Sequence, residues 1–313
     1  MSSHAELEQG LVVGGFGRHF LVETPEGRRL ICHPRGKKSQ AVVGDQVLWQ
    51  ASRDEGTIEK IEDRRNLFYR QDEIRTKSFA ANLDQVLILI AAEPEFSESQ
   101  LARALIAAEA EGITPVIALN KSDLSAPFER AWARLANYHD HMGYPVVRMS
   151  LKTGGAEDKA RLLQLLAHKT TLVLGPSGSG KSTLINLLVP GALALTNEIS
   201  QALNSGKHTT TSTTWYWLDS APAAPGQQRA ALIDSPGFQQ FGLNHIDPMR
   251  LASYMPDLKR HGTGCKFYNC SHLHEPGCGV IAALNAPDGE HPITAERYKI
   301  YQDLFAELSQ TRY

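Results

Sequence analysis

A glycine-rich stretch at residues 175–183 decides the fold, and it reads Gly175-Pro176-Ser177-Gly178-Ser179-Gly180-Lys181-Ser182-Thr183. An apolar run at 171–174 precedes it, and an apolar helical pattern at 181–188 follows it. Between a strand and a helix, this pattern is typical of a loop whose backbone N–H groups surround phosphates. Lys181 is expected to neutralise the β- and γ-phosphates, and the Ser182 hydroxyl to bind Mg²⁺. The sequence therefore predicts a site for a nucleoside triphosphate with Mg²⁺, and a plain glycine-rich turn is the alternative.

A second motif indicates that the base is guanine. It consists of Asn120, Lys121, Ser122 and Asp123, directly after an apolar run at 115–119. The Asp123 carboxylate can accept two hydrogen bonds from the N1–H and N2–H₂ edge of guanine, a pair of donors that adenine lacks. Asn120 is expected to brace the loop, and Lys121 to lie along the face of the base. Taken alone, such a motif is more often a surface turn.

The order of the motifs is rotated. In most switch GTPases the phosphate loop comes first, whereas here Asn120 to Asp123 and a second base-reading loop, Ser150-Leu151-Lys152, both precede Gly175. The rotation weakens the surface-turn alternative and predicts a circularly permuted GTPase domain, which we place at residues 69–245. Predicted strands at 86–91, 115–119, 146–149, 171–174, 214–218 and 229–233 alternate with predicted helices at 98–112, 127–141, 157–167 and 181–188. This alternation is typical of a mostly parallel, doubly wound α/β sheet.

Two segments after the phosphate loop are typical of nucleotide switches. Asp234-Ser235-Pro236-Gly237 ends an apolar run, so Asp234 is expected to hold Mg²⁺ through water and the Gly237 N–H to sense the γ-phosphate. The segment at 206–211 is similar to the mobile loop whose threonine closes on Mg²⁺ only when a triphosphate is bound. Thr210 and Thr211 are the first candidates for that threonine. A plain Ser/Thr-rich loop is the alternative.

One position departs from the usual pattern of switch GTPases. Many of them carry a Gln directly after the glycine of the second switch, where it orients the attacking water. Here that position is Phe238, which cannot form a hydrogen bond through its side chain. We therefore expect slow intrinsic hydrolysis, or a water-orienting group from elsewhere. Our hypothesis is His208, which adjoins the switch threonines and titrates near neutral pH. A solvent-exposed loop histidine without a role is the alternative.

Residues 1–68 indicate a small β-barrel. Short strands are predicted at 10–16, 19–23, 29–33, 45–50 and 56–62, separated by turns rich in Gly and Pro. Five strands in this length favour an oligonucleotide-binding (OB) barrel, and an SH3-like barrel without a ligand is the alternative. Positive and negative side chains nearly balance here, so an RNA contact would have to be a local patch.

Residues 246–313 are expected to form a helical domain that binds one structural Zn²⁺. Three thiols and an imidazole, Cys265, Cys270, His272 and Cys278, form a closed four-ligand set that leaves no position for a catalytic water. Rival fourth ligands are His274 and His261, and three reduced cysteines without a metal are a further alternative. An amphipathic helix is predicted at 295–309, with its apolar stripe in the core.

Composition sets broader limits. The chain has 313 residues, of which 42% are hydrophobic and 21% charged, and its net charge is −2, so we expect an ordinary soluble globular protein without a strong basic field. Its longest apolar run, at 86–92, is far shorter than the roughly 18 residues of a membrane span. The first residues do not resemble a secretory signal. We predict a cytoplasmic monomer that has no membrane partner.

The rotated motif order, the phosphate loop, Lys207-His208-Thr209-Thr210-Thr211, Asp234-Ser235-Pro236-Gly237-Phe238 and the Cys/His pattern together resemble the RsgA (YjeQ) family of permuted GTPases. The resemblance spans essentially the whole chain, although Lys207 stands where Arg is expected in many relatives. It implies an OB barrel, a permuted GTPase domain and a zinc-bearing helical domain. It also implies a late step in maturation of the 30S ribosomal subunit, contact with 16S ribosomal RNA, and GTP hydrolysis that the subunit stimulates.

Two other functions are compatible with part of the pattern. An RNA-binding zinc protein whose nucleotide site only adds stability would explain Phe238, but the intact Lys181 and Asp234 oppose it. An ATP-dependent kinase would use the same phosphate loop, but Asp123 opposes it. For the GTPase, the permutation places the segment after Gly237 directly before the helical domain. Loss of the γ-phosphate is therefore expected to reposition that domain on its partner.

Overall fold

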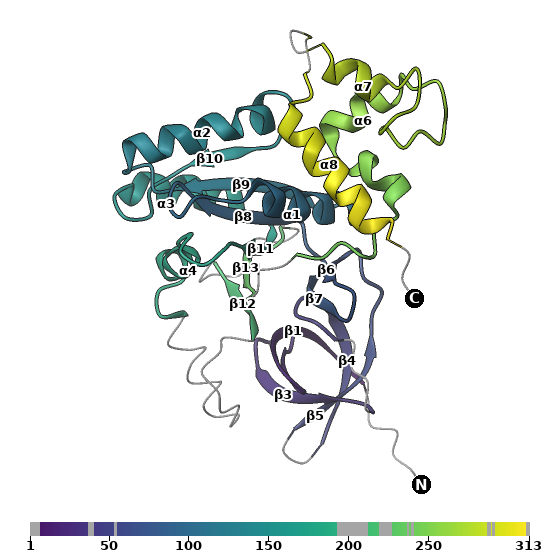
Figure 1. Ribbon diagram of the computed structural model, residues 1–313. Coiled ribbons are helices and arrows are strands. Elements are labelled where there is room, and N and C mark those ends of the chain that lie inside the picture. Colours follow the sequence, from purple (N-terminus) through teal and green to yellow (C-terminus); the bar gives the residue numbers. More distant parts are fainter. Residues whose placement is uncertain are drawn as a thin grey trace.

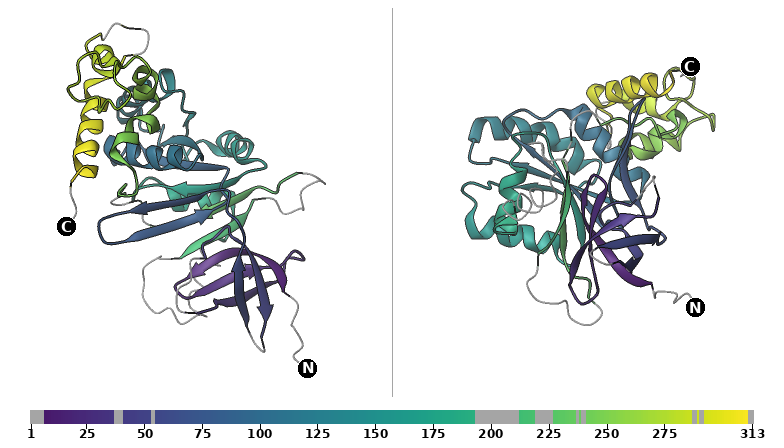
Figure 2. Two further views of the ribbon diagram at one scale, coloured as in Figure 1. Left: turned by 90° about the vertical axis from the view of Figure 1, so that its right-hand side faces the viewer. Right: turned by 90° about the horizontal axis from the view of Figure 1, so that it is seen from below.

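The computed structural model describes residues 7–36, 41–52, 55–192, 212–218, 227–236, 238, 241–286, 289 and 292–310. Figure 1 shows a small β-barrel at one end, an α/β domain in the middle and a group of helices at the other end. The left view in Figure 2 again shows the barrel and the helical domain at opposite ends of the molecule. Among the described residues, no helix combines the length and apolar character that crossing a membrane requires.

The barrel has five strands: β1 (Glu8–Phe16), β2 (His19–Glu23), β3 (Arg29–Pro34), β4 (Gln46–Ala51) and β5 (Gly56–Ile61). Strand β1 pairs with both β2 and β4, β4 pairs with β5, and β3 runs parallel to β5. The circle β1-β2-β3-β5-β4 is the OB arrangement, so that prediction is confirmed over the SH3-like alternative. Val12, Val22, Val47 and Trp49 fill the interior.

The α/β domain contains the predicted six-stranded sheet, in the order β10 (Val146–Arg148), β9 (Thr114–Asn120), β8 (Gln85–Ala91), β11 (Thr170–Leu174), β13 (Ala231–Asp234) and β12 (Thr213–Trp217). Five of these strands are parallel, and β12 is antiparallel to β13. Strand β11, which leads into the phosphate loop, is central. The strands that precede it in the chain lie on one side of it, and those that follow lie on the other. This is the topology that a circular permutation produces.

Two pairs of helices cover the two faces of this sheet. Helices α1 (Glu98–Ala110) and α2 (Ser125–Asp140) pack on the face that carries Val86, Ile88 and Ile90. Helices α3 (Gly155–Leu166) and α4 (Lys181–Leu188) pack on the face of Leu87 and Leu89. Strand β8 is buried on both sides, and its sequence is continuously apolar from Val86 to Ala91, as is typical of a central parallel strand.

A β-hairpin between the barrel and the α/β domain was not predicted. Its strands are β6 (Leu67–Gln71) and β7 (Thr76–Ala81), and β6 crosses position 68, where we placed a domain boundary. Charged residues at 70–77 obscure the alternating pattern by which strands are recognised. The hairpin instead contributes two buried rings, Phe68 and Phe79, which pack against Phe241 with ring centroids 5.6 and 5.8 Å away.

The barrel and the α/β sheet are also joined directly. Strand β1 pairs with β12 through Gly14 opposite Thr214 and Gly15 opposite Thr213, so both sheets form one continuous 11-stranded sheet. The Trp217 Nε1–H donates to Glu23 Oε1 at 2.8 Å across the same junction. The Trp217–Glu23 hydrogen bond links residues 194 positions apart in the chain. No local pattern in the sequence predicts these contacts.

The C-terminal part is helical, as expected, with a 3₁₀ helix η1 (Pro248–Tyr254), α6 (Pro256–Gly262), α7 (Gly279–Leu284) and α8 (Ala295–Leu308). Thr294 caps the start of helix α8, because its hydroxyl accepts from Arg297 N. The predicted apolar stripe of α8 is in the core, with Phe305 half-buried. A buried ion pair between Arg297 and Asp257 lies against the Tyr138 ring of α2. Together with Arg103 and Glu307, this contact docks the helical domain on α1 and α2.

Candidate functional site

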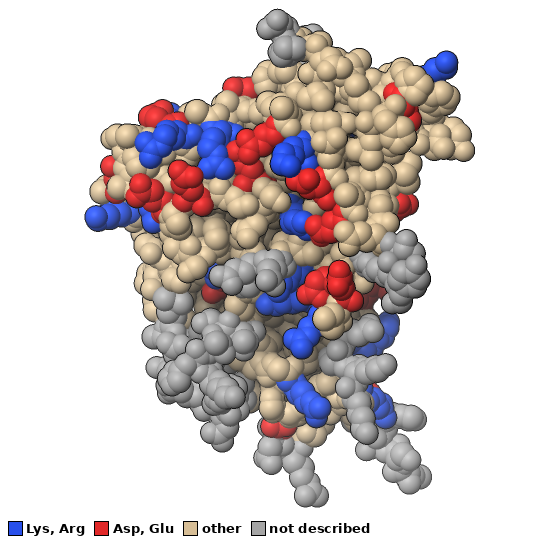
Figure 3. Space-filling model, in the orientation of Figure 1, with Lys and Arg blue, Asp and Glu red and all other residues tan. Residues whose placement is uncertain are grey.

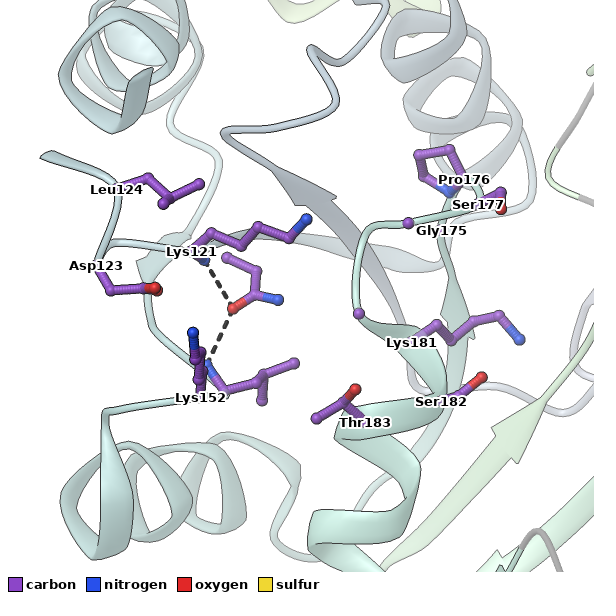
Figure 4. Close-up of a pocket in the computed structure, with 14 residues that line it drawn as sticks. Lys121, Asp123, Leu124, Lys152, Gly175, Pro176, Ser177, Lys181, Ser182 and Thr183 are labelled. Atoms are coloured by element: carbon purple, nitrogen blue, oxygen red, sulfur yellow. Dashed lines mark hydrogen bonds between the residues drawn. The ribbon is translucent and has the colours of Figure 1, made fainter. Parts of the chain in front are cut away.

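The motifs predicted to bind nucleotide line one pocket of about 660 Å³. It lies where β9 and β11 end, at the edge of the sheet where ligands bind in folds of this kind. In Figure 4, Lys121, Asp123 and Lys152 lie on one side of the pocket, and the phosphate loop with Lys181, Ser182 and Thr183 lies on the other. The lining residues are Asn120, Lys121, Asp123, Leu124, Leu151, Lys152, Gly175, Pro176, Ser177, Gly178, Gly180, Lys181, Ser182 and Thr183.

The phosphate loop has the conformation that its glycines allow. Gly178 and Gly180 have positive φ angles of 81° and 102°, which side chains of L-residues disfavour. A Cβ atom on Gly180 would also lie 2.4 Å from Asn120 Nδ2. Helix α4 starts at Lys181 without a side-chain cap, so the N–H groups of its first turn remain available to an anion. Such a helix start is well suited to bind phosphate.

The side chain of Asn120 ties the loops of the pocket together. It is 3% exposed, and its Nδ2 donates to the Ser179 carbonyl at 2.9 Å. Its Oδ1 accepts from the backbone N–H of Lys121 at 2.7 Å and of Leu151 at 3.0 Å, as the dashed lines in Figure 4 mark. One amide thus links the first base loop, the second base loop and the phosphate loop, in agreement with its expected bracing role.

A hydroxyl network orients Asp123. The Ser150 hydroxyl donates to Asp123 Oδ1 at 2.7 Å, and this bond lowers the pKa of the Asp123 carboxyl. Ser150 in turn accepts from the N–H and hydroxyl of Thr153, at 3.2 and 2.8 Å, and its own N–H donates to Asp158 Oδ2 at 2.8 Å. The carboxylate is therefore ionised and held in place near neutral pH. The roles of Thr153 and Asp158 were not predicted, because neither belongs to a recognisable motif.

The predicted phosphate and magnesium residues are adjacent. Lys181 Nζ forms an ion pair with Asp234 Oδ1, and the Ser182 side chain lies one residue further along α4. Asp234 is buried at the end of β13, next to Ser235, whose hydroxyl bonds to that of Thr213 at 3.0 Å. A cationic ammonium and a carboxylate thus neutralise each other where phosphate and Mg²⁺ are expected.

Part of the predicted site lies outside the described residues, namely Lys207, His208, Thr210, Thr211 and Gly237. Phe238, the residue after Gly237, does belong to the described residues. Phe238 is 4% exposed and packs near Phe241, with ring centroids 6.4 Å apart. The side chain at the usual water-orienting position is therefore part of the hydrophobic core.

A second candidate site is a group of four side chains that could hold a metal ion. The ligand atoms of Cys265, Cys270, His272 and Cys278 all lie within 4.8 Å of one another. His272 Nδ1 is 3.4 Å from Cys265 Sγ and 3.5 Å from Cys278 Sγ, and neither His261 nor His274 belongs to the group. Three sulfurs and one imidazole nitrogen match the donors of a tetrahedral structural zinc site.

Backbone and tyrosine contacts support this group. The N–H of Gly279 points to Cys265 Sγ at 3.4 Å and that of Ile281 to Cys278 Sγ at 3.5 Å, which orients the two sulfurs. Helix α8 fixes the loop, because the Tyr298 hydroxyl donates to the His272 carbonyl at 2.7 Å. Tyr301 bonds in the same way to the carbonyl of Ser271.

The sequence of the chain matches that of a known protein family. A model of the RsgA GTPase family matches residues 61–244, more than half of the chain. The chain belongs to the RsgA GTPase family. Two relatives named small ribosomal subunit biogenesis GTPase RsgA, from Variovorax paradoxus and Paraburkholderia xenovorans, are 73% and 50% identical. The matches cover 98% and 96% of this chain, and 94% and 93% of the relatives.

Two solved structures of the RsgA type share the whole architecture. YjeQ from Thermotoga maritima is 28% identical, with a TM-score of 0.72 over 98% of this chain and 100% of that chain. YloQ, described as a circularly permuted GTPase, is 26% identical, with a TM-score of 0.69 over 100% of this chain and 99% of that chain. The permuted GTPase fold predicted from the motif order is confirmed. Membership of the family identifies the chain as a GTP hydrolase.

Proposed function

We propose that this GTPase acts late in maturation of the 30S ribosomal subunit, as a checkpoint that hydrolyses GTP when the subunit stimulates it. The observation that carries the proposal is the convergence of a guanine-type carboxylate and a phosphate loop on one pocket of a permuted GTPase. The relatives' names connect the family with biogenesis of the small subunit. We keep the division into a barrel at 1–68, a GTPase domain at 69–245 and a helical domain at 246–313.

In the proposed site, each group has one task. Asp123, held by Ser150, reads the guanine edge, while Lys121 and Lys152 flank the base. Binding of phosphates would draw Lys181 away from Asp234 and free that carboxylate for the hydrated Mg²⁺. The bound cation would neutralise charge between the β- and γ-phosphates. The full proposed set is Asn120, Lys121, Ser122, Asp123, Ser150, Lys152 and 175–183 for GTP, and Ser182, Thr210, Thr211 and Asp234 for Mg²⁺.

Stabilisation of the transferring phosphoryl group would come from Lys181 and the Gly237 N–H, and orientation of water from His208. Burial of Phe238 supports a water-orienting group outside the usual position. A His208→Ala variant should bind GTP as wild type does and hydrolyse it more slowly. An unchanged stimulated rate would remove His208 from the mechanism.

The proposed ligand of the barrel is 16S ribosomal RNA. Its OB topology supports this, since the fold commonly binds oligonucleotides. On the face shown in Figure 3, Lys and Arg side chains lie across the barrel and its junction with the α/β domain, with Asp and Glu side chains among them, and α2 also carries both signs. We further propose one structural Zn²⁺ at Cys265, Cys270, His272 and Cys278, a cytoplasmic location, a monomeric state and no membrane partner.

The decisive experiment compares partners. Multiple-turnover GTP hydrolysis is measured for the full chain alone and with purified 30S subunits, 50S subunits or free 16S RNA. We expect an acceleration of at least about tenfold with 30S subunits alone, which is modest for a GTPase activated by a partner. Equal rates with 50S subunits or with free RNA would contradict the checkpoint role.

Base recognition has a separate test, the Asp123→Asn variant. An asparagine presents one acceptor and one donor to the guanine edge, so the donor meets N2–H₂ or N1–H unfavourably. Because the unmatched polar groups are left unpaired, GTP affinity should fall by about 10²-fold or more, and xanthosine triphosphate should become the preferred ligand. Competition against a fluorescent GDP measures the affinities for GTP and for xanthosine triphosphate. Asp140→Asn, at the end of α2, is the matched control. Retained preference for GTP over xanthosine triphosphate in Asp123→Asn would refute the guanine assignment.

A further inference from the structure

Three described residues that follow the proposed magnesium ligand Asp234, namely Pro236, Phe241 and Gly242, are held from two sides. The Lys77 ammonium of β7 donates to the Pro236 carbonyl at 2.7 Å, and the Gln71 N–H of β6 donates to the Gly242 carbonyl at 3.0 Å. Phe241 is 1% exposed, and its ring stacks on Phe79 at an interplanar angle of 11°. Hydrophobic packing therefore fixes Phe241 on the side of the hairpin.

On the other side, one arginine of α1 reaches the segment. The Arg103 Nη1 donates to the Phe241 carbonyl at 3.2 Å and to Glu307 Oε1 at 2.9 Å, while its Nη2 binds Glu307 Oε2. The Arg103 side chain is only 19% exposed. The two parallel bonds to Glu307 form a charge-assisted fork, which fixes the plane of the guanidinium as well as its position. Nη1 is thereby directed to the Phe241 carbonyl.

The carboxylate that orients Arg103 comes from the other end of the protein. Glu307 lies in the last turn of α8 and is 204 positions away from Arg103 in the chain. Figure 1 shows α8 beside α1, with its C-terminal end toward the hairpin. The arginine thus joins three elements: α1, α8 and the segment after Asp234.

We propose that Arg103 is a positioning residue for GTP hydrolysis, which acts by fixing the Phe241 carbonyl and so the segment that begins at Asp234. This inference rests on the proposed role of the Asp234 to Gly237 motif at the γ-phosphate. In the chain, Gly237 lies between Pro236 and Phe241, whose carbonyls bond to Lys77 and Arg103. Arg103 therefore limits where this motif can meet a γ-phosphate, although it lines no part of the pocket. GDP lacks that phosphate, so its binding should not depend on Arg103.

A control with the same chemistry exists nearby. Arg134 of α2 donates through Nε to Glu98 Oε1 at 3.0 Å and through Nη2 to the Phe96 carbonyl at 3.0 Å. Arg134 therefore binds the same two kinds of acceptor as Arg103, a carboxylate and a phenylalanine carbonyl. Unlike Arg103, it forms no hydrogen bond to the described residues between 236 and 244. Loss of either arginine removes similar interactions, but only Arg103 is expected to affect the response to the γ-phosphate.

The experiment compares full-length Arg103→Gln and Arg134→Gln by the dissociation constants for GDP and for a non-hydrolysable GTP analogue, and by single-turnover hydrolysis. Arg103→Gln should weaken binding of the analogue by at least about fivefold, a typical size for coupling between sites. It should also slow hydrolysis and leave the affinity for GDP unchanged. Arg134→Gln should change neither the ratio of the two constants nor the rate. Glu307→Gln should act in the same direction as Arg103→Gln, and Arg103→Lys should recover only part of the effect, because it lacks the fork.

The proposal is overturned if a folded Arg103→Gln protein has the wild-type ratio of dissociation constants for the GTP analogue and GDP. Should that variant not fold, the ratio in Glu307→Gln decides, since the Glu307 side chain is 39% exposed and its loss is tolerable. A double variant Arg103→Gln/Glu307→Gln should not add to the single effect, because both act on one contact. If the wild-type chain binds neither nucleotide, the proposed function itself fails, and this outcome is distinct from an unchanged ratio.

Discussion

Replacing Lys181 with alanine is expected to lower the rate of GTP hydrolysis by about 10²- to 10³-fold, the usual cost of losing one preorganised charge at a transition state. Lys181 is the lysine of the phosphate loop, and its ammonium already lies at the Asp234 carboxylate, at the expected position of phosphate and Mg²⁺. The glycines and the start of α4 do not depend on its side chain, so the variant should fold. Rates are measured at saturating GTP with 30S subunits present.

A second lysine provides the control for this variant. Lys169 precedes β11 and bonds to Gln85 Oε1 and to the Leu165 carbonyl, both at 3.3 Å, outside the pocket. Lys169→Ala removes the same charge from the same domain and should hydrolyse GTP at the wild-type rate. Hydrolysis by Lys181→Ala within a few-fold of wild type would show that the phosphates bind elsewhere.

Removing the metal is expected to unfold the part of the helical domain that surrounds it. Without a cation, three sulfurs within 4.8 Å of one another and of an imidazole have no charge partner at their centre. Structural zinc sites contribute an apparent binding free energy of about 10–16 kcal/mol, which here would stabilise the loop between α6 and α7. Cys270→Ser should abolish binding of the metal, and metal analysis should find one Zn²⁺ per wild-type chain. Limited proteolysis should then cut the variant near residues 262–279.

Cys32→Ser is the matched control for this experiment. Cys32 is also buried, but it lies in β3 of the barrel, far along the chain from the metal group. Its replacement should leave one Zn²⁺ bound and the helical domain resistant to protease. A Cys270→Ser protein that retains one equivalent of zinc would exclude this residue as a ligand.

Local patterns predicted most of the fold. Helix α4 begins and ends at the predicted residues, and the strand that delivers Asn120 differs from its prediction by one residue at each end. These elements are set by neighbours in the chain: a glycine loop before a helix, or an apolar run before a polar motif. The same holds for α8, whose apolar stripe was predicted and is in the core.

Features that depend on distant parts of the chain could not be predicted. Arg103 lies in an ordinary amphipathic helix, and only the folded structure brings Glu307 and Phe241 to it. The hairpin β6–β7 has charged residues on both strands. Its two buried rings, Phe68 and Phe79, pack against Phe241, which is distant in the sequence. Likewise, Thr153 and Asp158 support the base loop through Ser150, which no spacing rule indicates.

The pairing of β1 with β12 has a consequence for the order in which the chain folds during synthesis. On one edge of β1, the first half of the strand pairs with β4 and the second half pairs with β12. During synthesis, β4 therefore becomes available to β1 early, and β12 becomes available much later. Because domains fold as they emerge, the barrel can close once residue 61 has left the exit tunnel, with the edge at Gly14 and Gly15 still open. Only when Trp217 emerges does that edge find its partner. The first strand to be made therefore waits for one of the last strands of the nucleotide domain, and a slow step in folding of the whole protein is expected at this pairing.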